Sequence, residues 1–165
     1  HDPMLMPSDL GCYAGSKACS ETLVQSYANL FNVIVFRYFF IYGPGQNRTM
    51  LLPRLMDNIA NEDVISLVGE QGIEINPIHV HDAVDALVAS MKLQHSATYN
   101  IAGPDILSIR KIAELLGGHL GVDPCFDSQP GKAVGLIADI SKMCDELGAP
   151  KRSLSEHLAD LEKGS

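Results

Sequence analysis

Hydrophobic positions in the first quarter of the chain follow a helical and then a strand pattern. Between residues 10 and 30 apolar side chains recur every three or four positions, which places them on one face of an α-helix. Ser8 or Asp9 can cap this helix and Asn32 ends it. Residues 33–39 form a nearly continuous β-branched and aromatic run, typical of a strand buried on both faces of a parallel sheet. Helix followed by buried strand is half of a βαβ unit.

The rest of the chain continues this alternation of helices and strands. Two glycines and a proline force a loop at residues 41–46. Residues 69–72 separate two strand patterns by a length suited to a hairpin. Ser108 and Gly121 are placed to cap the two ends of one helix. The pattern predicts helices at 49–61, 82–94, 109–120 and 139–148 and a last one capped by Ser153 and Glu156, with strands at 64–68, 73–78, 98–102 and 133–137.

Composition and charge narrow the class of protein. The chain has 165 residues, 46% hydrophobic and 19% charged, which suits one globular core or a piece of a larger protein. The net charge of −8 and the absence of any lysine or arginine run exclude nucleic acid and anionic membranes as expected partners. No apolar stretch reaches the roughly 18 residues that span a bilayer. The sequence leaves open a targeting signal upstream of His1.

The four cysteines form no C-x-x-C pair and are too sparse for a disulfide scaffold. We therefore expect reduced, small core residues in a cytoplasmic protein. His79-Val80-His81-Asp82 places two histidines on one face of a strand, which suits a metal ion, but a strand end followed by a helix cap explains the same residues. We therefore predict no metal site.

Tyr13 and Lys17 carry the clearest chemical signal. They stand at i and i+4, so they lie one turn apart on one helix face. A free phenol has a pKa of about 10, and a neighbouring ammonium stabilises the phenolate. Such a pair can take a proton from a sugar or alcohol hydroxyl if a hydride acceptor lies beside it. Taken alone, the pattern also fits an exposed tyrosine and lysine with no chemical role. Ser16 and Ser20 lie nearby, but no histidine follows to activate a serine nucleophile.

Five motifs in series give this pair a context. They are Tyr13-x-x-x-Lys17, Arg37-Tyr38-Phe39 running into Tyr42-Gly43-Pro44-Gly45-Gln46, Asn76-Pro77-Ile78-His79-Val80-His81-Asp82, Tyr99-Asn100-Ile101-Ala102-Gly103 and Ala138-Asp139-Ile140-Ser141-Lys142. Together they resemble the extended short-chain dehydrogenase/reductases, in particular the NAD-dependent nucleotide-sugar epimerases and dehydratases. The resemblance covers nearly the whole chain.

The resemblance implies an α/β fold: the C-terminal part of an extended Rossmann-type, doubly wound parallel sheet, plus a small α/β substrate-binding subdomain. Residues 1–62 would be the remnant of the dinucleotide-binding domain and residues 63–165 mainly the substrate-binding subdomain. The family's glycine-rich turn is absent, since Gly117-Gly118 and Gly121 end a helix instead of opening one. The family's catalytic serine or threonine would also precede His1. We expect truncation to have removed that half, and we expect no catalysis by this chain alone.

The resemblance also implies roles for individual residues. Tyr13 would be the catalytic acid/base, and Lys17 would lower its pKa and bind the nicotinamide ribose. Cofactor contacts would also come from Tyr38, Phe39, Phe40 and Ile41, and substrate contacts from Phe40, Gln46, Arg54 and Asn76. Phe40 stands where many relatives have asparagine, and Ile75 where many have arginine, so two polar anchors for a diphosphate are missing.

The cofactor implied is NAD, with NADP left open because the deciding residue would lie upstream. The implied substrate is a nucleotide sugar, and epimerase, dehydratase and reductase remain alternatives. We expect a homodimer through the helix that carries Tyr13 and Lys17 and the helix that follows it. The rival prediction is a non-catalytic interaction module, because the 33–39 strand without its family neighbours would leave an apolar edge open to association.

Overall fold

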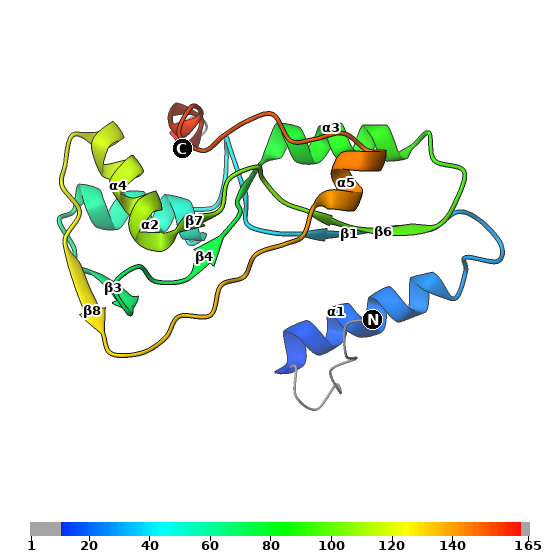
Figure 1. Cartoon of the computed structure of the whole chain (residues 1–165), viewed down its shortest axis with the longest axis horizontal. Helices are drawn as coiled ribbons and strands as arrows, with labels where there is room; N and C mark the ends of the chain where they lie inside the picture. Colours follow the sequence, from blue (N-terminus) through cyan, green and yellow to red (C-terminus); the bar gives the residue numbers. More distant parts are fainter. Residues whose placement is uncertain (1–10, 163–165) are drawn as a thin grey trace.

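The computed structural model describes residues 11–162, which form an α/β fold (Figure 1). The described elements are, in order, α1 (Gly11–Gln25), β1 (Ile34–Tyr38), β2 (Ile41–Tyr42), α2 (Leu51–Ala60), β3 (Ile65–Val68), β4 (Glu74–Ile75), β5 (Ile78–His79), α3 (Val80–Ser90), β6 (Ala97–Ile101), β7 (Leu107–Ser108), α4 (Ile109–Leu120), β8 (Phe126–Gln129), α5 (Ser141–Glu146) and a short 3₁₀ helix (Leu158–Leu161). None of these helices is long and apolar enough to cross a bilayer.

The strands form four two-stranded pieces, and three of them are parallel. β1 pairs with β6, from Ile34 opposite Ala97 to Tyr38 opposite Ile101. β2 pairs with β5 and β3 with β8, also in parallel, whereas β4 and β7 are antiparallel. Parallel pairs require a crossover between their strands, and α2 and α3 lie between β1 and β6 in the chain. The parallel α/β architecture predicted from the sequence is therefore confirmed.

Helices marked by nearby capping residues or by hydrophobic periodicity were predicted well. The helix predicted at 109–120 has those bounds: the Ser108 hydroxyl accepts from the Lys111 amide at 3.1 Å, and Gly121 ends the helix with φ +71°. The predicted 49–61 helix is α2, with Pro53 in its first turn. The Asp139 carboxylate accepts from the Ser141 amide at 2.9 Å just before α5, but Ile140 is the N-cap of that helix and no side chain caps it. Ser8, Asp9 and Leu10 lie outside the described residues.

The predicted hairpin around residues 69–72 is wrong. β3 pairs with β8, and β4 pairs with β7. The hydrophobic pattern of the sequence did not reveal β7 or β8 as strands. The Gly69 amide extends the β3–β8 ladder by donating to the Gln129 carbonyl at 2.8 Å, so distant segments satisfy the backbone groups that a hairpin would have used. The strand predicted at 133–137 is also absent from the described chain; Leu136 makes only an isolated bridge. The last predicted helix is only the short 3₁₀ helix, and the predicted cap is not formed: His157 is its N-cap, and the side chains of Ser153 and Glu156, which precede it, bond each other at 2.9 Å.

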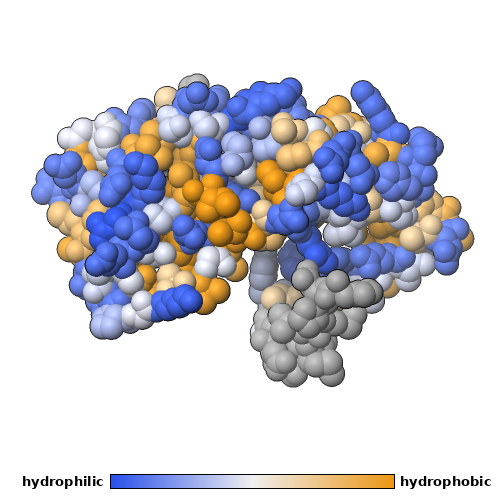
Figure 2. Space-filling view, viewed as in Figure 1, coloured by the Kyte–Doolittle hydropathy of each residue, from blue (hydrophilic) through white to orange (hydrophobic). Residues whose placement is uncertain are grey.

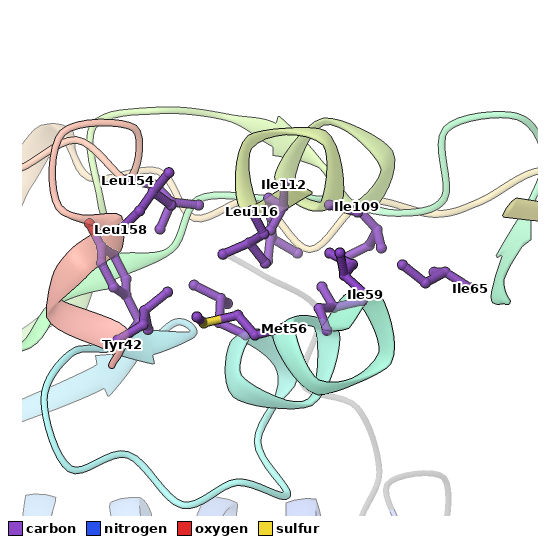
Figure 3. Close-up of a cluster of buried hydrophobic side chains, with 14 of the residues drawn as sticks. Tyr42, Met56, Ile59, Ile65, Ile109, Ile112, Leu116, Leu154 and Leu158 are labelled. Carbon is purple, nitrogen blue, oxygen red and sulfur yellow. The ribbon is translucent and has the colours of Figure 1, made fainter. Parts of the chain in front are cut away.

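Two hydrophobic clusters hold the fold together. The larger lies between α2, α4 and the C-terminal segment (Figure 3) and contains Tyr42, Leu52, Met56, Ile59, Ile112, Leu116, Leu154 and Leu158 among others. The smaller joins α3, β6 and α5 through Ile78, Ala83, Ala86, Tyr99, Ile101 and Met143. Both helices of the larger cluster turn one apolar face inward, as their sequence periodicity indicates.

The N-terminal segment contributes little to either cluster. None of the residues of α1 is buried, and Figure 1 shows this helix set apart from β1 and β6. The predicted helix ends early, at Gln25, and residues 26–30 form turns. β1 is only partly buried and not buried on both faces as predicted, because α1 does not pack closely on it. Tyr38, at its end, is 44% exposed.

Several predicted core residues also lie at the surface. Cys12, Cys19 and Cys125 are exposed and Cys144 is half-buried, all with free thiols, so the prediction of core cysteines is wrong. Figure 2 shows hydrophobic side chains among hydrophilic ones on one face of the molecule. Val134 and Leu136, in the segment before α5, are among the exposed large hydrophobic residues.

Candidate active site

Tyr13 and Lys17 lie on one face of α1, as their spacing predicts. The Lys17 ammonium is 5.6 Å from the centre of the Tyr13 ring. The Tyr13 side chain is 78% exposed, so its phenol is open to a substrate. The helix therefore presents the acid/base candidate and its cation together at the surface.

A cleft of about 570 Å³ separates α1 from β1. Tyr13, Lys17 and Glu21 line it from α1, and Phe36 and Tyr38 from β1. The Arg37 guanidinium bridges it by donating to both carboxylate oxygens of Glu21, at 3.1 and 2.5 Å. Because α1 has no buried residue, this bidentate pair is a principal tie between the Tyr13 helix and the sheet.

A second cavity, of about 590 Å³, lies where β1 and β2 end. The carboxyl ends of parallel strands are where ligands bind in such sheets. Tyr38 lines both this cavity and the α1 cleft, so the two spaces meet at one side chain. Partial burial raises the pKa of the Tyr38 phenol, which stays protonated near neutral pH. The cavity is lined by Phe40, Ile41, Tyr42, residues 43–47, Met50, Leu51, Leu52 and Val80.

The loop that forms this cavity has an unusual backbone. Phe40 adopts φ +45°, a left-handed conformation that costs energy for a bulky side chain. Gly43 has φ +149°, and a Cβ there would lie 2.6 Å from the Val80 Cγ1, so only glycine fits. The Gln46 amide donates to the Ile41 carbonyl at 2.7 Å and fixes the loop. Its Oε1 is buried with no partner among the described residues, and a ligand hydroxyl could donate to it.

The structure brings some predicted site residues together and separates others. Six of them line one or both of the two spaces: Tyr13, Lys17, Tyr38, Phe40, Ile41 and Gln46. Phe39 and Arg54 line neither of them; Arg54 is exposed on α2.

Asn76 is 3% exposed, and its amide makes two 3.0 Å hydrogen bonds with the backbone of Ala138. These bonds use its polar atoms to join two parts of the fold, away from the cavity. Ile75, which stands where many relatives have arginine, is fully buried in the larger cluster.

The structure gives the His79 ring a structural role at the start of α3. The His79 Nδ1 accepts from the His81 amide at 3.2 Å, so His79 caps α3. Residues 11–162 contain no group of three or more His, Cys, Asp or Glu side chains placed to hold a metal ion.

Comparison with known proteins decides the family. Residues 3–102 match the model of the NAD-dependent epimerase/dehydratase family. The chain belongs to this family. It is 26% identical over 142 residues to the "uncharacterized UDP-glucose epimerase YtcB" of Bacillus subtilis, covering 82% of this chain and 45% of that protein. It is also 26% identical over 145 residues to dTDP-4-dehydro-6-deoxyglucose reductase of Escherichia coli, covering 82% and 46%.

The same relationship holds for solved structures. UDP-glucuronic acid 4-epimerase from Bacillus cereus, solved with UDP-glucuronic acid and NAD, matches with a TM-score of 0.78 and 25% identity over 90% of this chain and 50% of that chain. The chain thus spans about half the length of the relatives it matches and corresponds to their C-terminal part. Membership in an enzyme family with NAD as cofactor is thereby confirmed.

The described residues fit only one end of this cofactor. Tyr13 and Lys17 offer a phenol and an ammonium for the nicotinamide and its ribose. A dinucleotide pyrophosphate needs a glycine-rich turn that opens a helix. Gly117 and Gly118 instead lie inside α4, and Gly121 ends it.

Sequence reasoning missed part of the cavity wall and the tie between α1 and β1. Tyr42 lies in the predicted 41–46 loop and Met50 lies shortly after it. The loop was therefore a sequence signal by which both residues could have been placed in the cavity wall. Val80 enters from a helix far along the chain, and nothing local reveals it. The Glu21–Arg37 pair joins a helix and a strand 16 residues apart, and only the tertiary fold places them together.

Proposed function

We propose that this chain supplies the catalytic helix and part of the substrate wall of an NAD-dependent nucleotide-sugar epimerase or dehydratase. The observation that carries the proposal is the placement of Tyr13 and Lys17 on one face of α1, beside a cleft that meets the β1–β2 cavity at Tyr38. The family match and the nucleotide-sugar complexes of similar structures support it.

In this proposal Tyr13 moves the proton. Its phenol oxygen takes the proton of a sugar hydroxyl and returns it later, with the Lys17 ammonium 5.6 Å from the centre of the ring. Bound NAD would supply the hydride acceptor, with NADP as the alternative. Tyr38, Phe40 and Ile41 wall the space beside the reacting carbon and exclude water. General acid/base assistance of this kind contributes about 10²–10⁴-fold to the rate.

The substrate in this proposal is a nucleotide sugar. The unpartnered Gln46 oxygen is a candidate acceptor for a sugar hydroxyl. Arg54 is the one cation of the predicted substrate set, but it is exposed on α2 and lines neither space, so it is not a proposed phosphate contact. Asn76 is left out of the proposed set because its amide is engaged by Ala138.

A chimera tests this proposal. The C-terminal part of the Bacillus cereus UDP-glucuronic acid 4-epimerase is replaced by this chain, and NAD binding and sugar-nucleotide turnover are measured. We expect NAD binding and turnover in the chimera, and Tyr13→Phe should lower turnover at least 100-fold while NAD binding stays within about threefold, because only the proton transfer is lost. Tyr27→Phe, on an exposed tyrosine outside both spaces, is the matched control. Full turnover by the Tyr13→Phe chimera would refute the assignment.

A second candidate function is supported by exposed apolar side chains on α1 and in the turns after it. Leu23, Leu30 and Phe31 are 62%, 77% and 59% exposed, respectively, so a non-catalytic oligomerisation module is the alternative. The apolar face of α2 is buried against α4, so the expected homodimer would form through α1 alone. Light scattering and an NAD-binding assay on the chain test this: a dimer that Leu23→Glu abolishes, together with no NAD binding, supports the module, and a monomer at 100 μM refutes it.

A further inference from the structure

A buried polar cluster lies beneath the C-terminal segment, outside the candidate site. At its centre is His79, which is 0% exposed. Its Nδ1 accepts a hydrogen bond from the His81 amide, so this nitrogen carries no proton and the ring is neutral. Its Nε2 lies 3.2 Å from the Asp160 carboxylate, in the final 3₁₀ helix. One imidazole therefore caps α3 and also contacts the end of the chain.

The segment from Lys151 to Glu162 is attached at three polar points, the third of which is the ion pair between Glu162 and His119. At the first, the Lys151 and Arg152 amides donate to the Asp82 carboxylate at 3.0 and 2.8 Å, and the Arg152 guanidinium pairs with the same carboxylate. The second point is His79, which meets Asp160 and the ring of His157, 5.4 Å away between centroids. Between them, Leu154 and Leu158 pack into the larger core cluster beside Tyr42 (Figure 3).

A proton on His79 would meet mostly repulsive surroundings. Asp160 is the favourable neighbour, whereas His81, His157 and Arg152 all oppose a positive charge. The edge of the Tyr42 ring, 5.2 Å away between centroids, offers an unpartnered hydroxyl and no negative charge. Burial first, and His81 second, lower the pKa of His79.

We propose that residues 153–162 form a pH-sensitive latch that His79 holds closed while it is neutral. When a solvent proton binds Nδ1, that nitrogen can no longer accept from the His81 amide, and the α3 cap is lost. The buried cation that results is relieved when the segment moves away and water enters. The attachment of Lys151 and Arg152 to Asp82 does not depend on His79, so release begins after residue 152.

Release would reach the β1–β2 cavity. Tyr42 contacts the latch on one side and lines the cavity on the other, and Val80, the residue after His79, also lines it. When residues 153–162 move away, Tyr42 loses the side chains that pack against it, and this wall of the cavity becomes less ordered. Ligands of this cavity should therefore bind more weakly at acidic pH. One ion pair opposes release: the Glu162 carboxylate lies 3.4 Å from His119 on α4, and protonation of His119 strengthens that contact.

Hydrogen exchange and NMR titration on the 165-residue chain test the latch. Exchange of residues 153–162, corrected for the intrinsic pH dependence, is measured from pH 8 to 5, together with the imidazole signals of His79. Because His79 binds its proton more weakly in the closed form, opening should increase as pH falls through about 6.5, by at most tenfold per pH unit. The His81 amide should lose protection over the same range.

His79→Asn is the informative variant, because asparagine accepts at a helix N-cap without titrating. We expect its latch to stay protected to pH 5, while His95→Asn, on an exposed histidine that pairs with Glu146, should behave as wild type. Equal opening of wild type and His79→Asn would overturn the proposal. If His79→Asn does not fold, Asp160→Asn decides: loss of the one facing anion should raise the pH at which the latch opens. An unchanged pH, or a His79 that stays neutral until the whole chain unfolds, would also overturn it.

Discussion

Asp82 offers the sharpest test of how this fold is held together. Its carboxylate is 3% exposed, at the start of α3, and it accepts from the Lys151 and Arg152 amides and from the Arg152 guanidinium. These partners lie 69 and 70 residues along the chain. Replacing Asp82 by alanine leaves a half-buried guanidinium without its buried partner and two amides without acceptors.

The cost can be estimated from these contacts. Breaking a buried ion pair by removing one partner costs about 3–5 kcal/mol, and part of that is the desolvation of the two orphaned amides. Arg152 keeps its second contact, 3.2 Å from the Asp85 carboxylate, which places the expected loss at the lower end, about 3 kcal/mol. Asp82→Asn keeps one acceptor oxygen and should lose about 1–3 kcal/mol.

Asp85→Ala is the matched control. Asp85 lies one turn further along α3 and pairs with the same guanidinium, but its side chain is 61% exposed. An exposed pair contributes about 0–1 kcal/mol, so this variant should stay near wild type. The free energy of unfolding is measured by urea titration with circular dichroism. Equal losses in the two variants, or a loss below 1 kcal/mol in Asp82→Ala, would show that burial does not control the strength of this contact.

Three further predictions follow from local geometry. Ser108→Ala removes the cap of α4 and should lower the free energy of unfolding by about 1 kcal/mol in urea titration, with Ser108→Asn near wild type. Tyr99 donates to Glu146 at 2.7 Å and lowers the pKa of that carboxyl, so the stabilisation is present above the unfolded pKa and is lost as pH falls through the folded one. Tyr99→Phe should therefore weaken the dependence of the free energy of unfolding on pH, measured between pH 6 and 3. An unchanged slope would contradict this. Gly43→Ala should lower the thermal midpoint, because its Cβ would meet Val80 at 2.6 Å and its φ is +149°, while Gly118→Ala, with open space around it, should not.

The features that sequence could predict are those decided within one helical turn. Ser108, Gly121 and the Tyr13–Lys17 pair each depend on residues three or four positions away, and the structure has them as expected. The hairpin failed for the opposite reason. Two short apolar runs joined by a glycine-rich loop favour a hairpin locally, but β8 and β7 compete for their backbone groups from about 60 and 30 residues away.

Asp82 has a position that the sequence reveals and contacts that only the fold reveals. Its place at the start of a helix is visible in the sequence, and from that position alone it should interact with the helix N-terminus. In the structure His79 provides that cap, and Asp82 turns to the chain at residues 151 and 152. Hydrophobic periodicity cannot reveal this, because the pairing depends on where the C-terminal segment crosses α3.

The candidate site combines residues that local sequence patterns reveal with contacts that only the tertiary fold reveals. Tyr13 and Lys17 are set by helical spacing, and most of the β1–β2 cavity comes from one continuous stretch between residues 38 and 52, so both could be found without coordinates. What links them is Tyr38, which lines both spaces at the end of β1, while Glu21 and Arg37 join α1 to β1. A side chain that faces two spaces has no signature in a linear pattern. The candidate residues Tyr13 and Lys17 can therefore be found from the sequence, but how the Tyr13 helix lies relative to the β1–β2 cavity requires the fold.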